Sequence, residues 1–185
     1  MRVIRDSPPE NVMAIGKFEC VHLGHQALIH RAKEAGAKLG LPTVVLTFSP
    51  HPRAVLGSGD FRPLLSEKEV EWALRELCGA DYWLRYAFTE TTARMPPQEF
   101  CDVLFGRMKA RALFVGEGYR FGANRSGTVE TLGRCAARHG AGVSVAPLEK
   151  IGGAKISASR IRGLVERGEL DEAARLLGFP YPPRI

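Results

Sequence analysis

Short apolar runs alternate with longer segments of helical periodicity along the 185-residue chain. The apolar runs that end in turn residues predict five strands, at residues 12–16, 43–48, 81–87, 112–116 and 142–148. Helical periodicity with capping signals predicts helices at residues 24–39, 66–77, 96–108, 128–139, 159–167 and 169–177. The proline- and glycine-rich stretch 50–63 is predicted to be a loop, and residues 152–153 a turn. This alternation predicts an α/β fold, with a parallel sheet of five to six strands and helices on both faces.

The composition is typical of a globular domain, with 45% hydrophobic and 25% charged residues. A chain of this length favours one domain with a sizeable core. No apolar run is long enough to cross a membrane, and the N-terminal residues lack the apolar core of a signal peptide. We therefore expect a cytoplasmic protein.

The charge is basic, with a net value of +6 and a pI of about 9.4. A basic protein can bind nucleic acid, anionic lipid or anionic small molecules. The arginines are dispersed, and the sequence contains neither zinc-finger spacing nor an RNA-binding aromatic motif, so nucleic acid is not the expected partner. The four cysteines form no C-x-x-C pair; Cys78 and Cys101 are expected to be buried thiols, and no disulfide framework is predicted.

The most informative segment joins the first predicted strand to the first helix and contains His22 and His25. Residues three apart lie on one face of a helix, so both imidazoles can point the same way. A helix N-terminus offers unpaired N–H groups and positive partial charge, and Gly24 lets a ligand approach the backbone. This arrangement is typical of a phosphate site. Half of a metal site is the alternative, but no third ligand with metal-like spacing follows, so we expect no metal held by protein side chains.

The longer string IGKFECVHLGHQALI, starting at Ile15, resembles the entry motif of the bacterial FAD synthetases, in their FMN adenylyltransferase module. Three further strings match that family in the same order: TFSPHPRAVL at 47–56, VGEGYRFGANRSG at 115–127 and KISASRIRGLVERGELDEAARLLGFPY at 155–181. The histidine motif alone would imply only the wider nucleotidyltransferase superfamily. The resemblance implies a Rossmann-like nucleotidyltransferase fold over residues 1–179, and the reaction of ATP with FMN to give FAD and pyrophosphate.

The resemblance also implies the roles of individual residues. The catalytic residues would be His22, His25, Asn124, Ser159 and Arg162. ATP would be bound by Gly16, Phe18, Glu19, Gly24 and Ser157, and the flavin by Phe48, Pro50, His51, Pro52, Arg53, Tyr119 and Phe121. Mg²⁺ would arrive with ATP, keeping several waters and few protein ligands.

Simpler structural roles are open for several of these residues. Phe48 and Phe121 can be core residues, since most aromatic side chains are buried. Arg53 can be a solvated loop charge, and Ser159 a helix N-cap. Arg160 and Arg162 can both be surface charges.

The chain departs from the family pattern in two motifs. Glu19 and Cys20 replace the Asp-Gly of the entry motif, and Ala158 replaces a serine of the I-S-S-T signature. Glycine at position 20 would allow positive φ or close backbone approach, so a β-carbon there predicts strain of about 1 kcal/mol or crowding of the nucleotide. A non-catalytic or altered-specificity flavin- or nucleotide-binding homologue is therefore the alternative function. Residues 180–185 are expected to be a tail, with the family's riboflavin kinase module absent; the oligomeric state is not predicted.

Overall fold

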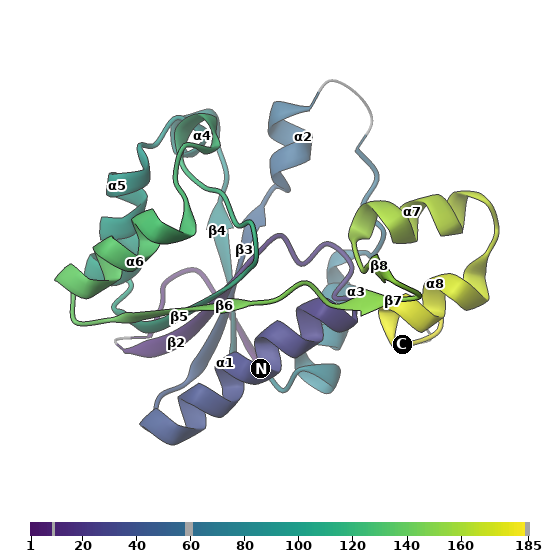
Figure 1. The fold of residues 1–185 in the computed structure, drawn as a ribbon, viewed down its shortest axis with the longest axis horizontal. Helices are drawn as coiled ribbons and strands as arrows, with labels where there is room; N and C mark the ends of the chain where they lie inside the picture. Colours follow the sequence, from purple (N-terminus) through teal and green to yellow (C-terminus); the bar gives the residue numbers. More distant parts are fainter. Residues whose placement is uncertain (9, 58–60, 184–185) are drawn as a thin grey trace.

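The computed structural model describes residues 1–8, 10–57 and 61–183. In this part of the chain a parallel sheet has six strands in the order β1-β4-β3-β2-β5-β6 (Figure 1). The strands are β1 (Arg2–Ile4), β2 (Asn11–Ile15), β3 (Thr43–Ser49), β4 (Tyr82–Ala87), β5 (Ala110–Gly116) and β6 (Gly142–Ala146). The predicted α/β fold and all five predicted strands are confirmed. The sequence did not predict β1, which has three residues, none of them buried, at the sheet edge.

Helices cover both faces of the sheet (Figure 1). On one face, α1 (Leu23–Leu39), α3 (Glu67–Trp72), α7 (Ala158–Glu166) and α8 (Leu170–Leu177) enclose an apolar core with Val12, Ala14 and Val45. On the other, α5 (Pro97–Cys101) and α6 (Val129–Arg138) pack over Met13, Ile15 and Val44. Neighbouring residues of β2 therefore serve opposite cores, as the alternation of side chains along a strand requires. Cys78 and Cys101 are buried in these cores, as predicted.

Two predicted helices contain wider turns than expected. The helix predicted at 66–77 is α3 followed by a π-helical segment, Ala73–Leu77, and the one at 96–108 is α5 followed by a second, Asp102–Arg107. The N-terminus of α3 has the predicted capping box: the Ser66 hydroxyl accepts from the Glu69 N–H, and the Glu69 carboxylate accepts from the Ser66 N–H.

The prediction of a loop over residues 50–63 is wrong in part, because α2 (Pro52–Leu56) lies within it; residues 58–60 are outside the described residues. His51 caps this helix by accepting a hydrogen bond from the Arg53 N–H, and Pro52 stands at a first-turn position where its fixed φ favours a helix. A short helix, α4 (Glu90–Ala93), and a hairpin, β7 (Lys150–Ile151) and β8 (Ala154–Lys155), were also not predicted. The predicted turn at 152–153 connects the two hairpin strands, and both glycines have positive φ.

The strand order reverses direction at β2. From β2 the chain proceeds outward through β3 to β4, whereas β5 and β6 lie on the other side of β2. In open parallel sheets, ligands bind beyond the carboxyl ends of the strands at such a reversal. The segments after β2 and β5 flank this position, and they carry two of the four motifs. Among the described residues, no helix has the length and apolar character needed to cross a membrane.

Candidate active site

The segment from the end of β2 into α1 has an unusual backbone; we call residues 16–25 the β2–α1 turn. Phe18 and Val21 have positive φ angles, of 46° and 42°, although neither is glycine. This conformation is rare for non-glycine residues and especially so for a β-branched one, and it costs about 1–3 kcal/mol per residue. Cys20 itself does not have positive φ. The backbone strain predicted at Cys20 is found at Phe18 and Val21 instead.

The strained turn is held by a side chain of α1. The Gln26 amide donates to the Val21 carbonyl at 2.8 Å and to the Leu177 carbonyl, at the end of α8, at 2.7 Å. Phe18 and Val21 are also fully buried in the core shared by α1, α7 and α8. Strain of this kind persists where the surroundings fix the backbone, and it is found most often at functional sites.

His22 and His25 lie side by side at the start of α1. Their rings are stacked, with centroids 3.7 Å apart and an interplanar angle of 12°. His22 is the N-cap residue, and its Nδ1 accepts from the His25 backbone N–H at 3.3 Å. The Phe18 ring packs edge-on against His25 with centroids 5.0 Å apart. A β-carbon at Gly24 would lie 3.3 Å from the His22 ring, so glycine lets the stacked pair sit against the backbone.

Both imidazoles are neutral near pH 7. Burial lowers the pKa of His22 to about 4, and burial together with the neighbouring His22 lowers the pKa of His25 well below its usual value. The His25 Nδ1 is shielded from solvent and has no hydrogen-bond partner in the part of the chain that the structure describes. An unsatisfied buried nitrogen is costly, and it marks a position where a ligand can supply the missing contact.

Cys20 points into the same pocket of side chains. It is fully buried, and burial, followed by the nearby charge of Glu19, raises the pKa of its thiol to about 12. One ligand atom from each of Cys20, His22 and His25 lies within 4.8 Å of the other two. No third ligand with metal-like spacing follows the histidines in the sequence, whereas Cys20 precedes them.

Glu19 connects the β2–α1 turn to α7. Its buried carboxylate forms a close ion pair with Arg162, and its other oxygen lies 3.9 Å from His51 Nε2. Arg162 also donates to the Arg62 carbonyl at 2.7 Å. Glu19 is one methylene longer than the family's aspartate, and its carboxylate pairs with Arg162 of the fourth motif. No local pattern indicates this pairing, because the two residues are 143 positions apart.

The segment after β3 brings two of the predicted flavin-side residues, His51 and Arg53, to the ring of Phe61. His51 stacks on the Phe61 ring with centroids 4.4 Å apart, and the guanidinium groups of Arg53 and Arg162 lie 5.5 and 5.7 Å from the centre of that ring. Burial lowers the pKa of His51 to about 4, with further contributions from Lys17, Arg53 and Arg162. The sequence analysis did not identify Phe61, because it lies in the segment assigned to a loop. Pro50 is exposed and Pro52 half-buried beside this cluster.

The aromatic residues of the second and third motifs form one cluster around Phe100. Phe48 packs against Tyr86, Phe88 and Phe100, whereas Phe121 packs against Phe100 and lies parallel to Tyr119. Phe121 is 6% exposed, so it belongs to the core, while Phe48 and Tyr119 are half-buried. These two can present an edge to a ligand.

Beyond Phe121, the loop after β5 ends in exposed polar residues. Asn124 is exposed and adopts a left-handed conformation with φ of 53°. Asparagine tolerates this conformation better than most residues. Partial desolvation of the amine lowers the pKa of Lys17 in the β2–α1 turn, and the nearby charges of Arg125 and Arg53 lower it further.

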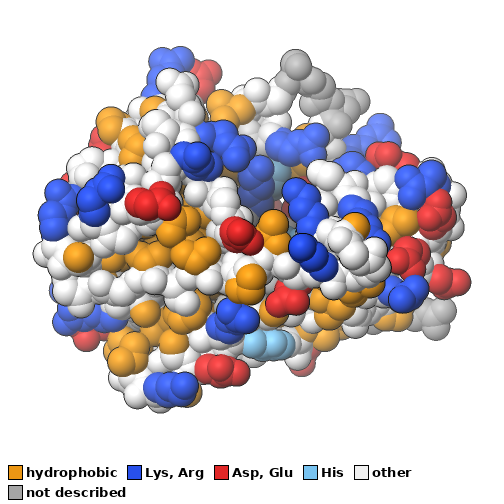
Figure 2. All heavy atoms as spheres, in the orientation of Figure 1, with side chains coloured by type: hydrophobic (Ala, Val, Ile, Leu, Met, Phe, Trp, Pro, Cys, Tyr) orange, Lys and Arg blue, Asp and Glu red, His pale blue; other side chains and the backbone are white. Residues whose placement is uncertain are grey.

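Lys17, Arg53 and Arg125 are therefore close enough to affect one another, and Figure 2 shows Lys and Arg side chains gathered around a recess in the upper half of this face. The sequence analysis missed Lys17 and Arg125, although each lies within a motif string. An open hollow of about 650 Å³ lies elsewhere, at the amino-terminal edge of the sheet, and its lining includes Arg2 and Asp81 but no motif residue.

The fourth motif forms the start of α7. Its N-cap is Ser157, whose hydroxyl accepts from the Arg160 N–H at 3.3 Å. The N-cap role considered for Ser159 is therefore wrong: Ser159 lies inside the first turn and is exposed. Ala158 is half-buried and packs against the apolar core, so its methyl group replaces a serine hydroxyl in an apolar environment.

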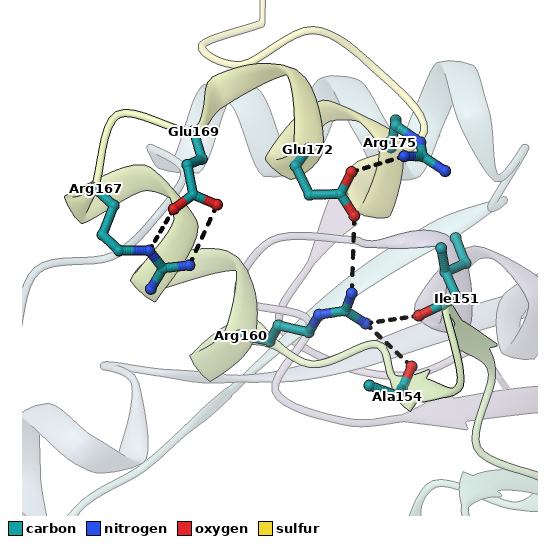
Figure 3. A network of polar contacts seen from close by, with 7 residues as sticks. All are labelled: Ile151, Ala154, Arg160, Arg167, Glu169, Glu172 and Arg175. Carbon is teal, nitrogen blue, oxygen red and sulfur yellow. Dashed lines mark hydrogen bonds and ion pairs between the residues drawn. The ribbon is translucent and has the colours of Figure 1, made fainter.

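Arg160 has a different environment from Arg162, two residues further on. Its guanidinium donates to the carbonyls of Ile151 and Ala154 and lies 3.8 Å from Glu172, which also pairs with Arg175 (Figure 3). A separate ion pair, Arg167 with Glu169, lies in the segment that joins α7 to α8. We call these seven residues the α7–α8 clamp. Arg160 is thus neither a site residue nor a free surface charge.

Comparison with known proteins agrees with this geometry. The sequence profile of a family described as FAD synthetase matches residues 4–160. The chain belongs to the FAD synthetase family. This confirms the resemblance predicted from the four motifs.

Curated relatives of this FAD synthetase family member share about a third of its residues. It is 34% identical to a bifunctional riboflavin kinase/FMN adenylyltransferase of Listeria monocytogenes, over 92% of this chain and 54% of that protein. It is 31% identical to the protein of the same name from Escherichia coli K12, over 96% of this chain and 58% of the relative. The chain spans little more than half the length of these relatives.

A solved structure shares the fold. A crystal structure described as a macrolide-efflux protein from Streptococcus pneumoniae matches with a TM-score of 0.85 and 30% identity. The match covers 96% of this chain and 60% of that one. The Rossmann-like α/β architecture of the FAD synthetase family member is therefore also found in a crystal structure.

Proposed function

We propose that this chain transfers the adenylyl group of ATP to FMN, giving FAD and pyrophosphate. One observation carries the proposal: the start of α1 presents two stacked neutral imidazoles, and the opposing helix α7 brings Arg162 to the same turn. Family membership agrees with this chemistry. ATP and FMN are the two substrates of the proposed reaction.

The reaction needs positioning and charge stabilisation more than acid–base chemistry. An oxygen of the FMN phosphate forms a bond to the α-phosphorus of ATP, and the bond from that phosphorus to the bridging oxygen breaks. Pyrophosphate leaves with the electron pair. The FMN phosphate is largely dianionic near neutral pH, so no general base has to remove a proton. The protein has to hold two anions in line and stabilise the charge that builds on the leaving group.

The triphosphate is assigned to the β2–α1 turn. His22 and His25 would donate hydrogen bonds to phosphate oxygens beside the N-terminus of α1, with Gly16 and Gly24 shaping the surface against the nucleotide. Phe18, which is fully buried, would support that surface from the core. The N-terminus of α7 faces the same ligand, with Ser159 exposed in its first turn and Ser157 fixing its start. Arg162 would exchange part of its contact with Glu19 for a phosphate, as a permanent cation at the leaving group. Asn124 would approach from the loop after β5.

The flavin is assigned to the segment after β3. His51 and the ring of Phe61 provide a flat surface, flanked by Pro50 and Pro52. Phe48 and Tyr119 form the wall, with Phe121 behind them in the core. Arg53 sits over the Phe61 ring at the mouth and, with Lys17 and Arg125, would attract the phosphate of FMN.

Magnesium is assigned to the triphosphate. Within residues 1–8, 10–57 and 61–183, the one group of three metal-ligating side chains that meet is Cys20, His22 and His25. Its nitrogen and sulfur donors do not suit Mg²⁺, which prefers oxygen ligands and keeps several waters. A magnesium ion would therefore be held by phosphate oxygens and water, and would neutralise charge on the departing pyrophosphate.

The departures from the family pattern do not favour the non-catalytic alternative. Glu19 has a role in the site, because its carboxylate pairs with Arg162. Cys20 lies in the core without positive φ, so its β-carbon is accommodated. Ala158 packs its methyl group against apolar residues. We propose residues 1–179 as the adenylyltransferase unit. Tyr181 lies against it, with its hydroxyl donating to the Leu64 carbonyl. A cytoplasmic location is proposed with it, because the four cysteines are free thiols, as is usual in a reducing compartment.

The test is a chromatographic assay for FAD after incubation with ATP, Mg²⁺ and FMN, with riboflavin in place of FMN in a parallel reaction. FAD from FMN alone is expected. His22→Ala should abolish product while the fold is retained, and His30→Ala, on an exposed face of α1, is the matched histidine control. Absence of FAD from folded wild-type protein, or unchanged turnover in His22→Ala, would contradict the proposal.

A further inference from the structure

We propose that Cys20, His22 and His25 form a binding site for a thiophilic divalent cation such as Zn²⁺ or Cd²⁺. The three donors come from six consecutive residues, and the structure brings one ligand atom of each within 4.8 Å of the others. Cysteine at position 20 is one of this chain's departures from the family motif, so the site is a property of this chain.

The donor set matches the chemistry of these ions. Thiolate sulfur and imidazole nitrogen are the preferred ligands of Zn²⁺ and its heavier relatives, and three protein ligands leave one position open for water. Neutral imidazoles bind a metal without first losing a proton. The Cys20 thiol proton passes to solvent as the sulfur–metal bond forms.

The surroundings favour a bound cation. The His25 Nδ1 is buried without a partner in the described part of the chain, so a metal bond would satisfy a nitrogen that is otherwise unpaired. The carboxylate of Glu19 adds negative charge beside Cys20, although Arg162 offsets much of it. In a tetrahedral site the donor atoms would be about 3.5 Å apart, so they need to approach by at most about 1 Å. The two imidazoles must also tilt out of their nearly parallel stack, so that a lone pair of each points at the ion.

A bound ion would have a consequence for the proposed reaction. It would occupy the imidazole nitrogens that we assign to the triphosphate, so the metal-bound protein would not transfer the adenylyl group. This consequence rests on the proposed function, whereas the binding itself does not. The two are therefore tested separately.

The test is a titration of the full, substrate-free chain with Cd²⁺, followed by the ultraviolet charge-transfer band of a cadmium–thiolate bond. One equivalent is expected to produce the band. Cys20→Ala should lose it, and both Cys20→Ala and His25→Ala should weaken binding by at least about tenfold, since each removes a ligand. Cys78→Ala is the matched control, because it removes another buried thiol outside the cluster.

Several outcomes would overturn the proposal. They are no band in the wild-type protein, a band that persists in Cys20→Ala, or equal loss of the band in Cys78→Ala. Cys20→Ser provides a second variant of nearly the same size, and circular dichroism of each variant shows whether it is folded. Because no nucleotide is present, the result is independent of whether the chain makes FAD.

Discussion

The β2–α1 turn and the α7–α8 clamp differ in how far their polar groups are satisfied by the protein itself. In the turn, two non-glycine residues have positive φ and a buried His25 nitrogen has no partner among the described residues. In the clamp, each charged side chain has an oppositely charged partner, and all of these groups are exposed or half-buried. A region that keeps buried polar groups unsatisfied is prepared for a ligand, whereas a region whose charges are all paired serves to hold helices together.

The same contrast separates two arginines on one helix. Arg160 is satisfied by the carbonyls of Ile151 and Ala154, which anchor the β7–β8 hairpin to α7. Arg162 is directed to the β2–α1 turn and to the segment after β3. Two residues along a helix correspond to about 200°, so these side chains leave nearly opposite faces. Only Arg162 is placed to meet a substrate.

After the loss of product expected for His22→Ala, the next largest effect is expected from His25→Ala. Removal of one donor that stabilises transition-state charge costs about 10²–10³-fold in kcat. Arg167→Ala, which removes a charge from the clamp, should leave kcat within about twofold. Steady-state FAD formation measures both, and thermal unfolding shows whether each variant is folded. Equal kcat values for the two variants would contradict the assignment of catalysis to the turn and of a purely structural role to the clamp.

The buried histidines of the site should make the free energy of unfolding of the protein depend on pH. His22, His25 and His51 have pKa values lowered by burial, to about 4 for His22 and His51. As pH falls below about 6.5, the unfolded chain takes up protons that the folded chain refuses, so the free energy of unfolding decreases until pH approaches 4. His22 alone would contribute about 3 kcal/mol. Urea denaturation at several pH values measures this, and His22→Phe should give a shallower decrease. A wild-type stability that stays constant from pH 7 to 4.5 would show that the histidines are not held neutral.

Arg162→Lys is expected to reduce kcat by about tenfold or more, because lysine keeps the charge but loses the planar fork of donors. Arg160→Lys should lower the melting temperature with little change in kcat, since its partners are carbonyls and Glu172 of the scaffold. Measuring both kcat and melting temperature for each variant distinguishes the two roles. The reverse pattern, with Arg160→Lys the less active, would reassign the arginine of the fourth motif.

The smallest effect is expected from Arg175→Ala. The pair that Arg175 forms with Glu172, at 2.8 Å, lies on the surface of α8. Exposed pairs of this kind contribute about 0.5 kcal/mol or less. Chemical denaturation should therefore show a change near the limit of detection. A loss of several kcal/mol would mean that the clamp acts as one cooperative network.

The sequence predicted the elements whose signals are local. The five predicted strands have apolar runs bounded by turn residues, and Ser66 and Glu69 marked a helix start directly. The edge strand β1 was not predicted, because it has only three residues and none of them is buried. The helix α2 was missed because proline content was taken to indicate a loop, although Pro52 occupies the one part of a helix that accepts it.

The site was predictable as four stretches, but not as a set of contacts. The stacking of His22 on His25 follows from their spacing at a helix start. The pairing of Glu19 with Arg162, the Phe61 platform and the approach of Arg125 to Lys17 depend on the tertiary fold. Cys20 was considered as a source of strain, and its distance from the two imidazoles appears only in three dimensions.

The two hydrogen bonds of Gln26 have a consequence for the synthesis of the chain. One acceptor is the Val21 carbonyl, five residues away, and the other is the Leu177 carbonyl, 151 residues away. Chains are made from the N-terminus, so β2 and α1 emerge from the ribosome long before α8. The hydrogen bond that ties the histidine turn to α8 can therefore form only after Leu177, 151 residues beyond Gln26, has been synthesised.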